Sequence, residues 1–300
     1  MVMLLGLLVD TPMYLVYEEL KKLHTPCIFL NHCDLEEMKV NFSFGSSIKG
    51  TIEIYGKKIS INEISSSYFR TYNFFDYEGN ELLSYSDKRI QKMATTEDIL
   101  WSWAELTDTL MINPPSAMAS NNSKPYQSEI IKLFGFSIPE TLVTTSPNEA
   151  EKFWKRHGNI IYKSNSGVRS IIRKISENDR KRFLNIQFCP TLFQEFITGT
   201  DYRVHVVGNE TYSCKINSSA DDYRYENNEM EIVILPGDIE NKCIALTKHL
   251  GLHFSGIDLR KAINGKWYCF EVNPSPAFSY FEMKTGLPIA NAVARMLSHC

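Results

Sequence analysis

Apolar and polar residues alternate in two runs near the end of the chain, on either side of Asn264-Gly265. Asn-Gly is the strongest short signal for a two-residue hairpin turn, and such a turn fixes which residues face each other. Counted outward from the turn, Asp258 faces Glu271, and the strand period of two places Asn273 on the same side as Glu271. The other side of the hairpin is predicted to face the core and carries Ile257, Leu259, Phe270 and Val272.

The facing pair of acidic residues needs an explanation. Two such carboxylates on antiparallel strands have Cβ atoms roughly 4.5–5.5 Å apart. At an effective dielectric constant near 20, their repulsion would cost roughly 3 kcal/mol if both were ionised. Either Asp258 and Glu271 share a proton, or a cation lies between them, or they belong to an ordinary solvated face. With the amide oxygen of Asn273 they form a set of hard ligands, which suits Mg²⁺ that keeps water and phosphate oxygens as its other ligands.

The same reading of apolar patterns divides the chain into parts. Strands are predicted over residues 2–9 and 27–31, and between them a helix in which Thr11 is the N-cap and Pro12 the first residue. Strand, helix and strand in this order predict a parallel sheet. The predicted parts are an α/β domain (1–112), a linker with two prolines and small polar residues (113–123), a central lobe (124–194) and a strand-rich C-terminal lobe (195–300).

Composition narrows the classes of function. At 300 residues, the chain has room for one large or several small domains. A net charge of −3 argues against general affinity for nucleic acid. The seven cysteines show no metal-ligand spacing, which is typical of free thiols in a reducing cytoplasm. The apolar first nine residues are too short to span a bilayer, so no membrane association is expected. The absence of a Gly-x-x-x-x-Gly-Lys run excludes a P-loop enzyme.

Two stretches in the middle of the chain are candidates for nucleotide contacts. Lys163 ends an apolar strand and precedes a Ser-Asn-Ser-Gly segment. A lysine there can reach a phosphate while loop N–H groups contact others, although alone it is more readily explained as an exposed lysine. Gln194 and Glu195 interrupt an apolar strand, which alone reads as an exposed strand face.

Taken in order, these pieces resemble the ATP-grasp superfamily of ligases. The resemblance covers about residues 113–300 and rests on Lys124 at a helix start, Lys163, Gln194-Glu195-Phe196-Ile197, Asp258 and Phe270-Glu271-Val-Asn273-Pro. It implies an α/β (α+β) protein in which a central and a C-terminal lobe, each with an antiparallel sheet, hold ATP between them. The N-terminal α/β domain would be the usual companion.

The resemblance also implies roles for individual residues. Contacts with ATP are implied for Lys124, Lys163, Gln194, Glu195, Phe196, Ile197 and Asp201. Mg²⁺ is implied at Asp258, Glu271 and Asn273, and a part in catalysis for Lys163, Asp201 and Arg203. The segment after Lys163 departs from the glycine-rich loop of the superfamily, because Gly167 is its only glycine.

A closer resemblance is to ATP-grasp ligases that modify ribosomally made peptides, the microviridin-type (graspetide) macrocyclases. It rests on Tyr68-Phe-Arg70, Asp201-Tyr-Arg203, Asp222-Tyr-Arg224 and Asn273-Pro-Ser-Pro-Ala-Phe278. It implies substrate contacts by Arg203, Lys215, Arg224 and Ser275. We expect Arg203 to hold the carboxylate that is activated, because a planar guanidinium fits a carboxylate with two parallel hydrogen bonds. A plain ion pair with a neighbouring aspartate is the alternative for both arginines.

The implied partner is a precursor peptide or another carboxylate substrate, and homodimer formation is left open. Ligases that add glutamate to proteins or peptides share much of the pattern, so a ligase that adds an amino acid to a peptide or small molecule is the alternative enzyme. A nucleotide-binding regulatory protein without ligase activity is the alternative of another class. The facing carboxylates argue against it, because a non-catalytic clasp would not need a repulsive pair.

Overall fold

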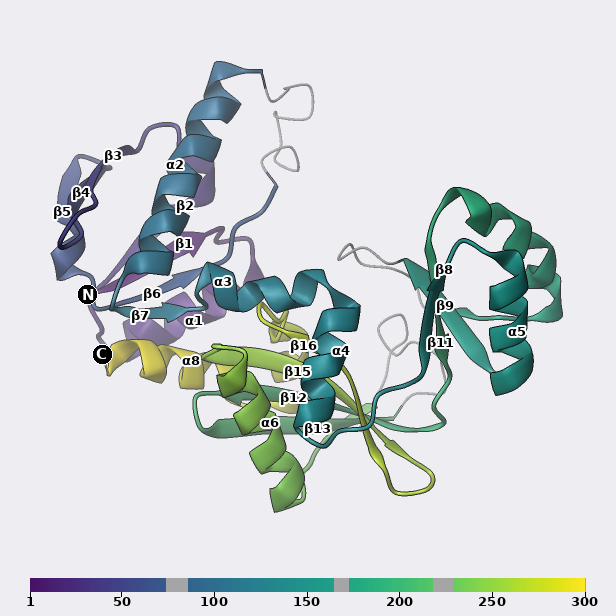
Figure 1. Cartoon of the computed structure of the whole chain (residues 1–300). Helices are drawn as coiled ribbons and strands as arrows, with labels where there is room; N and C mark the ends of the chain where they lie inside the picture. Colours follow the sequence, from purple (N-terminus) through teal and green to yellow (C-terminus); the bar gives the residue numbers. More distant parts are fainter. Residues whose placement is uncertain (74–85, 165–172, 218–228, 300) are drawn as a thin grey trace.

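The structure is a computed structural model that describes residues 1–73, 86–164, 173–217 and 229–299. Within these residues the strands form four sheets, and the two ends of the chain lie close together (Figure 1). None of the helices in these ranges is long and apolar enough to cross a membrane.

The N-terminal part is built on a parallel sheet, as predicted, and its four strands lie in the order β2-β1-β6-β7. Its strands are β1 (Val2–Gly6), β2 (Cys27–Asn31), β6 (Ser66–Phe69) and β7 (Leu110–Ile112), and its long helices are α1 (Thr11–Lys22) and α2 (Lys88–Leu106). All five residues of β1 are buried, which is typical of a strand covered on both faces. A small antiparallel sheet joins β3 (Lys39–Ser43), β4 (Lys49–Ile54) and β5 (Lys57–Ser60), next to the short helices η1 (His32–Asp34) and η2 (Ile61–Glu63).

The N-cap of α1 is Asp10, and the prediction of Thr11 was wrong. Asp10 has an extended backbone, and its carboxylate accepts the N–H of Met13 at 3.2 Å. Thr11 is already the first helical residue, and Pro12 follows in the first turn.

The segment predicted to be a linker is folded and packed. It contains α3 (Pro115–Met118) and the 3-10 helix η4 (Ala119–Asn122). Asn113 is only 2% exposed, and its amide donates to the carbonyls of Phe254 and Pro274 at 2.7 and 2.6 Å. A polar residue can begin a buried connection because its hydrogen-bonding groups are satisfied by backbone from a distant strand.

The central lobe holds an antiparallel sheet in the order β10-β9-β11-β8. Its elements are β8 (Thr141–Thr144), α5 (Pro147–His157), β9 (Ile160–Ser164), β10 (Arg173–Lys174), η5 (Glu177–Phe188) and β11 (Thr191–Glu195). Its own core includes Phe153, Phe183 and Phe193. Helix α4 (Lys124–Leu133), predicted to open this lobe, lies instead next to the sheet of the C-terminal lobe (Figure 1). Its Ile130 and Ile131 are buried in a core shared with that sheet.

The C-terminal lobe is a five-stranded antiparallel sheet in the order β14-β13-β12-β15-β16. Its elements are β12 (Gly199–Val207), β13 (Glu210–Asn217), β14 (Glu229–Ile232), α6 (Gly237–His249), β15 (Phe254–Ala262), β16 (Trp267–Asn273), α7 (Ser279–Thr285) and α8 (Ile289–Ser298). Helices α4 and α6 share a core with one face of the sheet, and α7 and α8 share a core with the other face and with α1.

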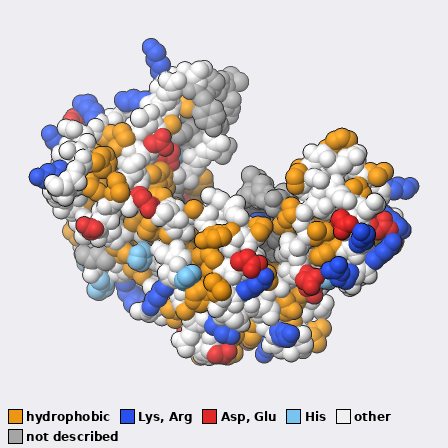
Figure 2. Space-filling view, in the orientation of Figure 1, with side chains coloured by type: hydrophobic (Ala, Val, Ile, Leu, Met, Phe, Trp, Pro, Cys, Tyr) orange, Lys and Arg blue, Asp and Glu red, His pale blue; other side chains and the backbone are white. Residues whose placement is uncertain are grey.

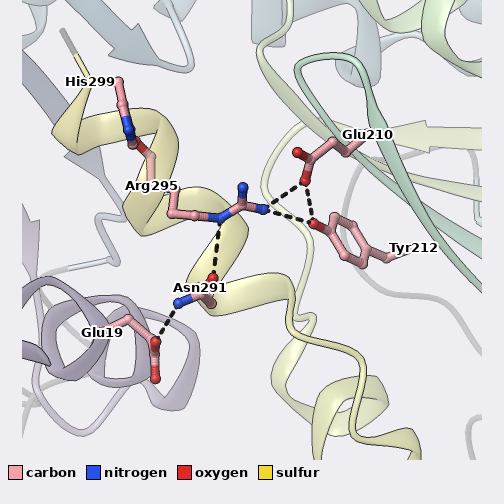
Figure 3. A network of polar contacts seen from close by, with 6 residues as sticks. All are labelled: Glu19, Glu210, Tyr212, Asn291, Arg295 and His299. Atoms are coloured by element: carbon pink, nitrogen blue, oxygen red, sulfur yellow. Dashed lines mark hydrogen bonds and ion pairs between the residues drawn. The ribbon is translucent and has the colours of Figure 1, made fainter. Parts of the chain in front are cut away.

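A polar network connects α8 to α1 on one side and to β13 on the other (Figure 3). Asn291 donates to Glu19 of α1 at 2.8 Å and accepts from Arg295 at 3.1 Å. Arg295 also donates to Glu210 at 2.8 Å and to the hydroxyl of Tyr212 at 3.3 Å, both on β13. The N-terminal part and the C-terminal sheet are therefore joined through one helix.

Candidate active site

Three charged residues form a row across the C-terminal sheet. In the strand register, Arg203 of β12 is the partner of Asp258 of β15, and Asp258 is the partner of Glu271 of β16. Cross-strand partners point to the same face, so the three side chains lie next to one another. The predicted pairing of Asp258 with Glu271 is confirmed.

The hairpin has this pairing although its turn and its register differ from the prediction. Ala262 N–H donates to the Lys266 carbonyl at 2.9 Å, so three residues rather than two form the loop, with Gly265 at φ +82°. Near the loop Leu259 therefore pairs with Cys269, and a bulge between Asp258 and Leu259 restores the predicted pairing farther out. The two departures from a regular two-residue hairpin cancel at the carboxylates.

The bulge changes which aromatic residue faces the core. Phe270 is the extra residue, and it is only half-buried, whereas Cys269 is 1% exposed and joins the core. The assignment of Phe270 to the core was wrong, because side-chain alternation reverses at a bulge. Its ring lies 5.3 Å from the guanidinium carbon of Arg260 and lines the cavity between the lobes.

Arg203 lies in a closed pocket beside Asp258. Its Nη1 donates to Asp258 Oδ1 at 2.6 Å, and its Nε donates to His205 Nε2 at 3.4 Å. The guanidinium also lies over the ring of Phe281, 5.3 Å from its centroid, and Arg203 is 5% exposed. Gly256 leaves room for it, since a Cβ there would lie 2.2 Å from Nη2. The plain ion pair considered for Arg203 is thus buried, and its partner is a candidate metal ligand.

His205 is fully buried next to this arginine. Its ring packs against Phe281 and Phe254, and its Nδ1 has no hydrogen-bond partner within the described chain. Burial, together with the positive charge of Arg203, holds the pKa of His205 well below its usual value. The ring is therefore neutral, and its Nε2 serves Arg203 as an acceptor.

Asp201 shares this face but has a partner of its own. It accepts two hydrogen bonds from Arg260, at 2.6 and 2.7 Å, and Arg260 Nη1 also donates to the carbonyl of Ile197 at 2.7 Å. Asp201 and Arg203 lie on the same face of β12, as expected. They do not pair with each other, because each side chain is paired with a residue of β15.

The segment predicted to contact adenine connects the two lobes. Glu195 N–H donates to the Glu140 carbonyl at 2.9 Å, and Phe196 N–H donates to the Asn159 carbonyl at 3.0 Å. The Nζ of Lys174 lies 3.9 Å from the centroid of the Phe196 ring, and the guanidinium carbon of Arg260 lies 5.5 Å from the same centroid. The connection is held in place by the two hydrogen bonds from Arg260 to Asp201 and by the two cationic side chains next to the Phe196 ring.

A cavity of about 580 Å³ lies where the central lobe meets α4 and the C-terminal sheet. Three of the residues that line it are Lys124, Gln194 and Phe270, from α4, β11 and β16. Gln194 is 7% exposed and donates to the Thr141 hydroxyl at 3.0 Å. Figure 2 shows the molecule hollowed between this lobe and the rest of the chain. Two of the residues predicted to contact ATP thus line one cavity.

The loop that carries Asn273 is held by side chains from three other elements. Gln127 of α4 donates to the Val272 carbonyl and accepts its N–H, both at 2.9 Å. Asn113 binds the Pro274 carbonyl, and Arg70 donates to Ser275 Oγ at 2.9 Å. Asn273 Oδ1 accepts the Ser275 N–H at 2.9 Å. Such contacts fix the direction of ligand side chains, as outer-sphere contacts do at metal sites.

The donor set fits Mg²⁺ better than a softer metal. The described residues contain no group of three or more His, Cys, Asp or Glu side chains that would hold a metal by themselves. Two carboxylates in register and one amide oxygen leave positions for water and phosphate oxygens, which is the usual coordination of Mg²⁺.

Some predicted residues are not part of this cluster. Lys215 is the strand partner of Tyr202, so it lies on the opposite face of the sheet, 3.7 Å from Glu231. Lys163 lies on β9 as the partner of Leu192, but its side chain is outside the described residues. Arg224 and the segment 165–172 with Gly167 also lie outside them.

Three residues of the site were missed by sequence reasoning: Lys174, His205 and Arg260. Arg70 was noted only as part of a motif, without a role at the site. The strand period does place Arg260 on the face of Asp258 and His205 on the face of Arg203. This signal becomes informative only when β12 and β15 are known to be neighbours.

Comparison with known proteins finds relatives among ATP-dependent ligases. A family model described as the RimK-like ATP-grasp domain matches residues 124–297. A "probable alpha-L-glutamate ligase" of Alkalilimnicola ehrlichii is 24% identical over 210 residues, covering 64% of this chain and 68% of that protein. A glutathione synthetase of Salmonella typhimurium is 35% identical over 77 residues, which is 25% of this chain and 23% of that one.

Solved structures resemble the whole chain. The macrocyclase MdnC of Microcystis aeruginosa, bound with its precursor peptide MdnA, superposes with a TM-score of 0.84 at 21% identity and full coverage of both chains. An ATP-grasp ligase of Chryseobacterium gregarium, associated with ribosomally made peptides and bound to ADP, leader and core peptide, gives 0.82 at 23% identity and coverages of 99% and 96%.

The chain belongs to the RimK-like ATP-grasp family. The predicted ATP-grasp fold and membership of this ligase superfamily are confirmed, and ATP and Mg²⁺ are the cofactors that ATP-grasp enzymes use.

Proposed function

We propose that this ligase activates a carboxylate of a ribosomally made precursor peptide as an acyl phosphate. A side-chain hydroxyl or amine of the same peptide then forms an ester or amide with it. The observation that carries the proposal is the row of Arg203, Asp258 and Glu271 across three strands. Phe270, the neighbour of Glu271 in the chain, lines the cavity between the lobes. A peptide substrate is supported by the precursor peptides bound to the structures that resemble the whole chain, N-terminal part included.

The reaction has two displacement steps. An oxygen of the substrate carboxylate attacks the γ-phosphorus of ATP, the bond to the bridging oxygen breaks, and ADP leaves. The incoming hydroxyl or amine then attacks the acyl carbon and loses its proton, and inorganic phosphate leaves. Little covalent chemistry falls to the protein, so positioning and charge neutralisation determine the rate.

Named residues supply this positioning. Lys124 and Lys163 are assigned to the phosphates or the adenine edge, and the 195–197 segment to adenine. Asp258, Glu271 and Asn273 are assigned to Mg²⁺, which neutralises phosphate charge when bound. The positive charge of Arg203 keeps the Asp258 carboxylate oriented next to the reacting groups.

Arg203 has a smaller part in substrate recognition than its sequence context suggested. A guanidinium that is 5% exposed and paired with Asp258 supports a role in ordering the site rather than an open fork for the substrate carboxylate. Substrate contacts by Ser275 and Arg224 stay predictions. Homodimer formation and a cytoplasmic location also stay predictions; free thiols such as Cys27, Cys33 and Cys189 suit the latter.

The test is a reconstitution. The purified chain is incubated with ATP, Mg²⁺ and an acidic, Ser/Thr-rich peptide encoded by a small open reading frame beside its gene. We expect the peptide to lose the mass of one water for each bond formed, and tandem mass spectrometry locates the linked side chains. Glu271→Gln with the same peptide is the matched control.

A ligase that adds an amino acid is the second candidate, favoured by the relative named as an alpha-L-glutamate ligase. It would add the mass of an amino-acid residue to the acceptor instead of removing water. A regulatory protein without ligase activity would show neither change and no substrate-dependent release of ADP.

A further inference from the structure

On its own strand, Arg203 contacts the buried imidazole of His205, two residues further along β12. His205 Nε2 accepts from Arg203 Nε at 3.4 Å, while Arg203 Nη1 donates to Asp258 Oδ1 at 2.6 Å. The two contacts use different nitrogens of one planar group, so together they fix both the place and the direction of the guanidinium.

The surroundings of His205 are otherwise apolar. The ring is 0% exposed and packs against Phe254 and Phe281, and its Nδ1 finds no partner within the described chain. Leaving a buried polar group unpaired costs about 1–3 kcal/mol, so an apolar side chain would serve the core better if packing were its only role. The acceptor that His205 offers to Arg203 is the feature that an apolar residue would lack.

We propose that His205 is a positioning residue, which aims the Arg203 guanidinium at Asp258 and thereby orients this carboxylate for the cation. The proposal rests on the magnesium site of the proposed function. His205 touches neither the metal nor the nucleotide and acts through Arg203. Outer-sphere residues of this kind typically change metal affinity by about 10–100-fold when they are replaced.

The test measures how much Mg²⁺ raises the affinity for a non-hydrolysable ATP analogue, by calorimetry with Mg²⁺ and with a chelator. His205→Met and His205→Gln have side chains of similar length, but only Gln offers an oxygen acceptor near the position of Nε2. We expect His205→Met to reduce the Mg²⁺ enhancement about tenfold or more. Its affinity for the analogue in the presence of chelator should stay within about twofold of wild type. His205→Gln should retain most of the Mg²⁺ enhancement. His32→Met is the matched control, because His32 is also 0% exposed but lies in the N-terminal part.

A double mutant separates positioning from general packing. In an Arg203→Lys background the Nε donor is gone, so His205→Met should cause no further loss of the Mg²⁺ enhancement. A full additional loss, or an unchanged enhancement in His205→Met alone, overturns the proposal. If wild type itself shows no Mg²⁺ enhancement, the magnesium site fails, and the role of His205 fails with it.

A measurement on the wild-type chain covers the case in which His205→Met does not fold. The Nε–H signal of Arg203 in a nitrogen-15 spectrum is assigned by its absence in Arg203→Lys. We expect its hydrogen exchange to be slow, since the group is buried and bonded. Exchange as fast as that of the exposed Arg156 would overturn the proposed contact.

Discussion

Arg70 Nη1 donates to Ser275 Oγ at 2.9 Å, which links the N-terminal sheet to the loop that carries Asn273. The same guanidinium is paired with Asp10, the N-cap of α1, at 2.6 Å through Nε. Arg70 and Asp10 are 7% and 8% exposed. The N-terminal part therefore supports the candidate metal site directly, and it does so through a buried charge pair.

Removing this arginine should cost stability. Arg70→Leu leaves Asp10 buried without its partner, and we expect the free energy of unfolding to fall by about 3–5 kcal/mol. Urea denaturation measures the change. Lys39→Leu breaks the exposed ion pair with Glu53 and should change the free energy of unfolding by less than about 1 kcal/mol. Equal effects of the two substitutions would contradict the structural role of Arg70.

The carboxylate pair gives a prediction for turnover. Glu271→Gln keeps the shape of the side chain but removes one of the two negative charges assigned to Mg²⁺. We expect turnover to fall by at least ~10²-fold, on the scale of one preorganised electrostatic contact. The measurement is ADP release with substrate and Mg²⁺, and Glu53→Gln on the distant strand β4 is the control. Full activity of Glu271→Gln, or of wild type in excess chelator, would rule out the assignment.

The opening hairpin illustrates what alternation along one strand can predict. Asp258 and Glu271 were paired from the sequence, although the turn and the bulge were both missed. Both departures shift the register by one residue in opposite senses, so the pair was recovered while Phe270 was put on the wrong face. An apolar residue that faces a ligand cavity looks the same in sequence as one that faces the core, so no local pattern marks the bulge.

Other parts of the site depend on contacts between distant segments. His205 and Arg260 acquire meaning only when β12 lies beside β15, and Arg70 only when its loop meets Ser275. Pairing of strands about 55 residues apart leaves no periodic signal in either strand, as the Arg203–Asp258 contact shows. The pairing of Asp258 with Glu271 could be predicted because both residues lie within one hairpin.

The nucleotide product tests the reaction class. Phosphorylation of a carboxylate by the γ-phosphate releases ADP and phosphate, whereas adenylation releases AMP and pyrophosphate. We expect ADP in proportion to the product, because the site resembles machinery for γ-phosphoryl transfer. Chromatography of the nucleotides measures this ratio, and stoichiometric AMP would contradict the mechanism.

The buried imidazole makes stability depend on pH. The pKa of His205 is held well below its usual value by burial and by Arg203, and burial also lowers that of His253. Below about pH 6.5 the unfolded chain therefore takes up protons that the fold does not, and the free energy of unfolding falls as pH decreases. For His205 alone the slope approaches about 1.4 kcal/mol per pH unit. His205→Met should flatten the curve between pH 6.5 and 5.5, and an unchanged slope would contradict the buried neutral state.

The last prediction concerns the space that Gly256 leaves for Arg203. A Cβ at this position would lie 2.2 Å from Arg203 Nη2 and 2.7 Å from Pro276 Cβ, so Gly256→Ala must displace the guanidinium or the loop after Asn273. We expect about 1–3 kcal/mol of destabilisation from overpacking. Activity should fall further, by about 10²-fold, because a shift of about 1 Å in a positioning group is sufficient for such a loss. ADP release with substrate at a temperature well below unfolding measures the effect. Gly237→Ala is the matched control, since nothing lies within 4 Å of its Cβ at the start of α6. If the two variants retain the same activity, the position of Arg203 does not matter for the reaction, and the role of the Arg203–Asp258 pair is lost.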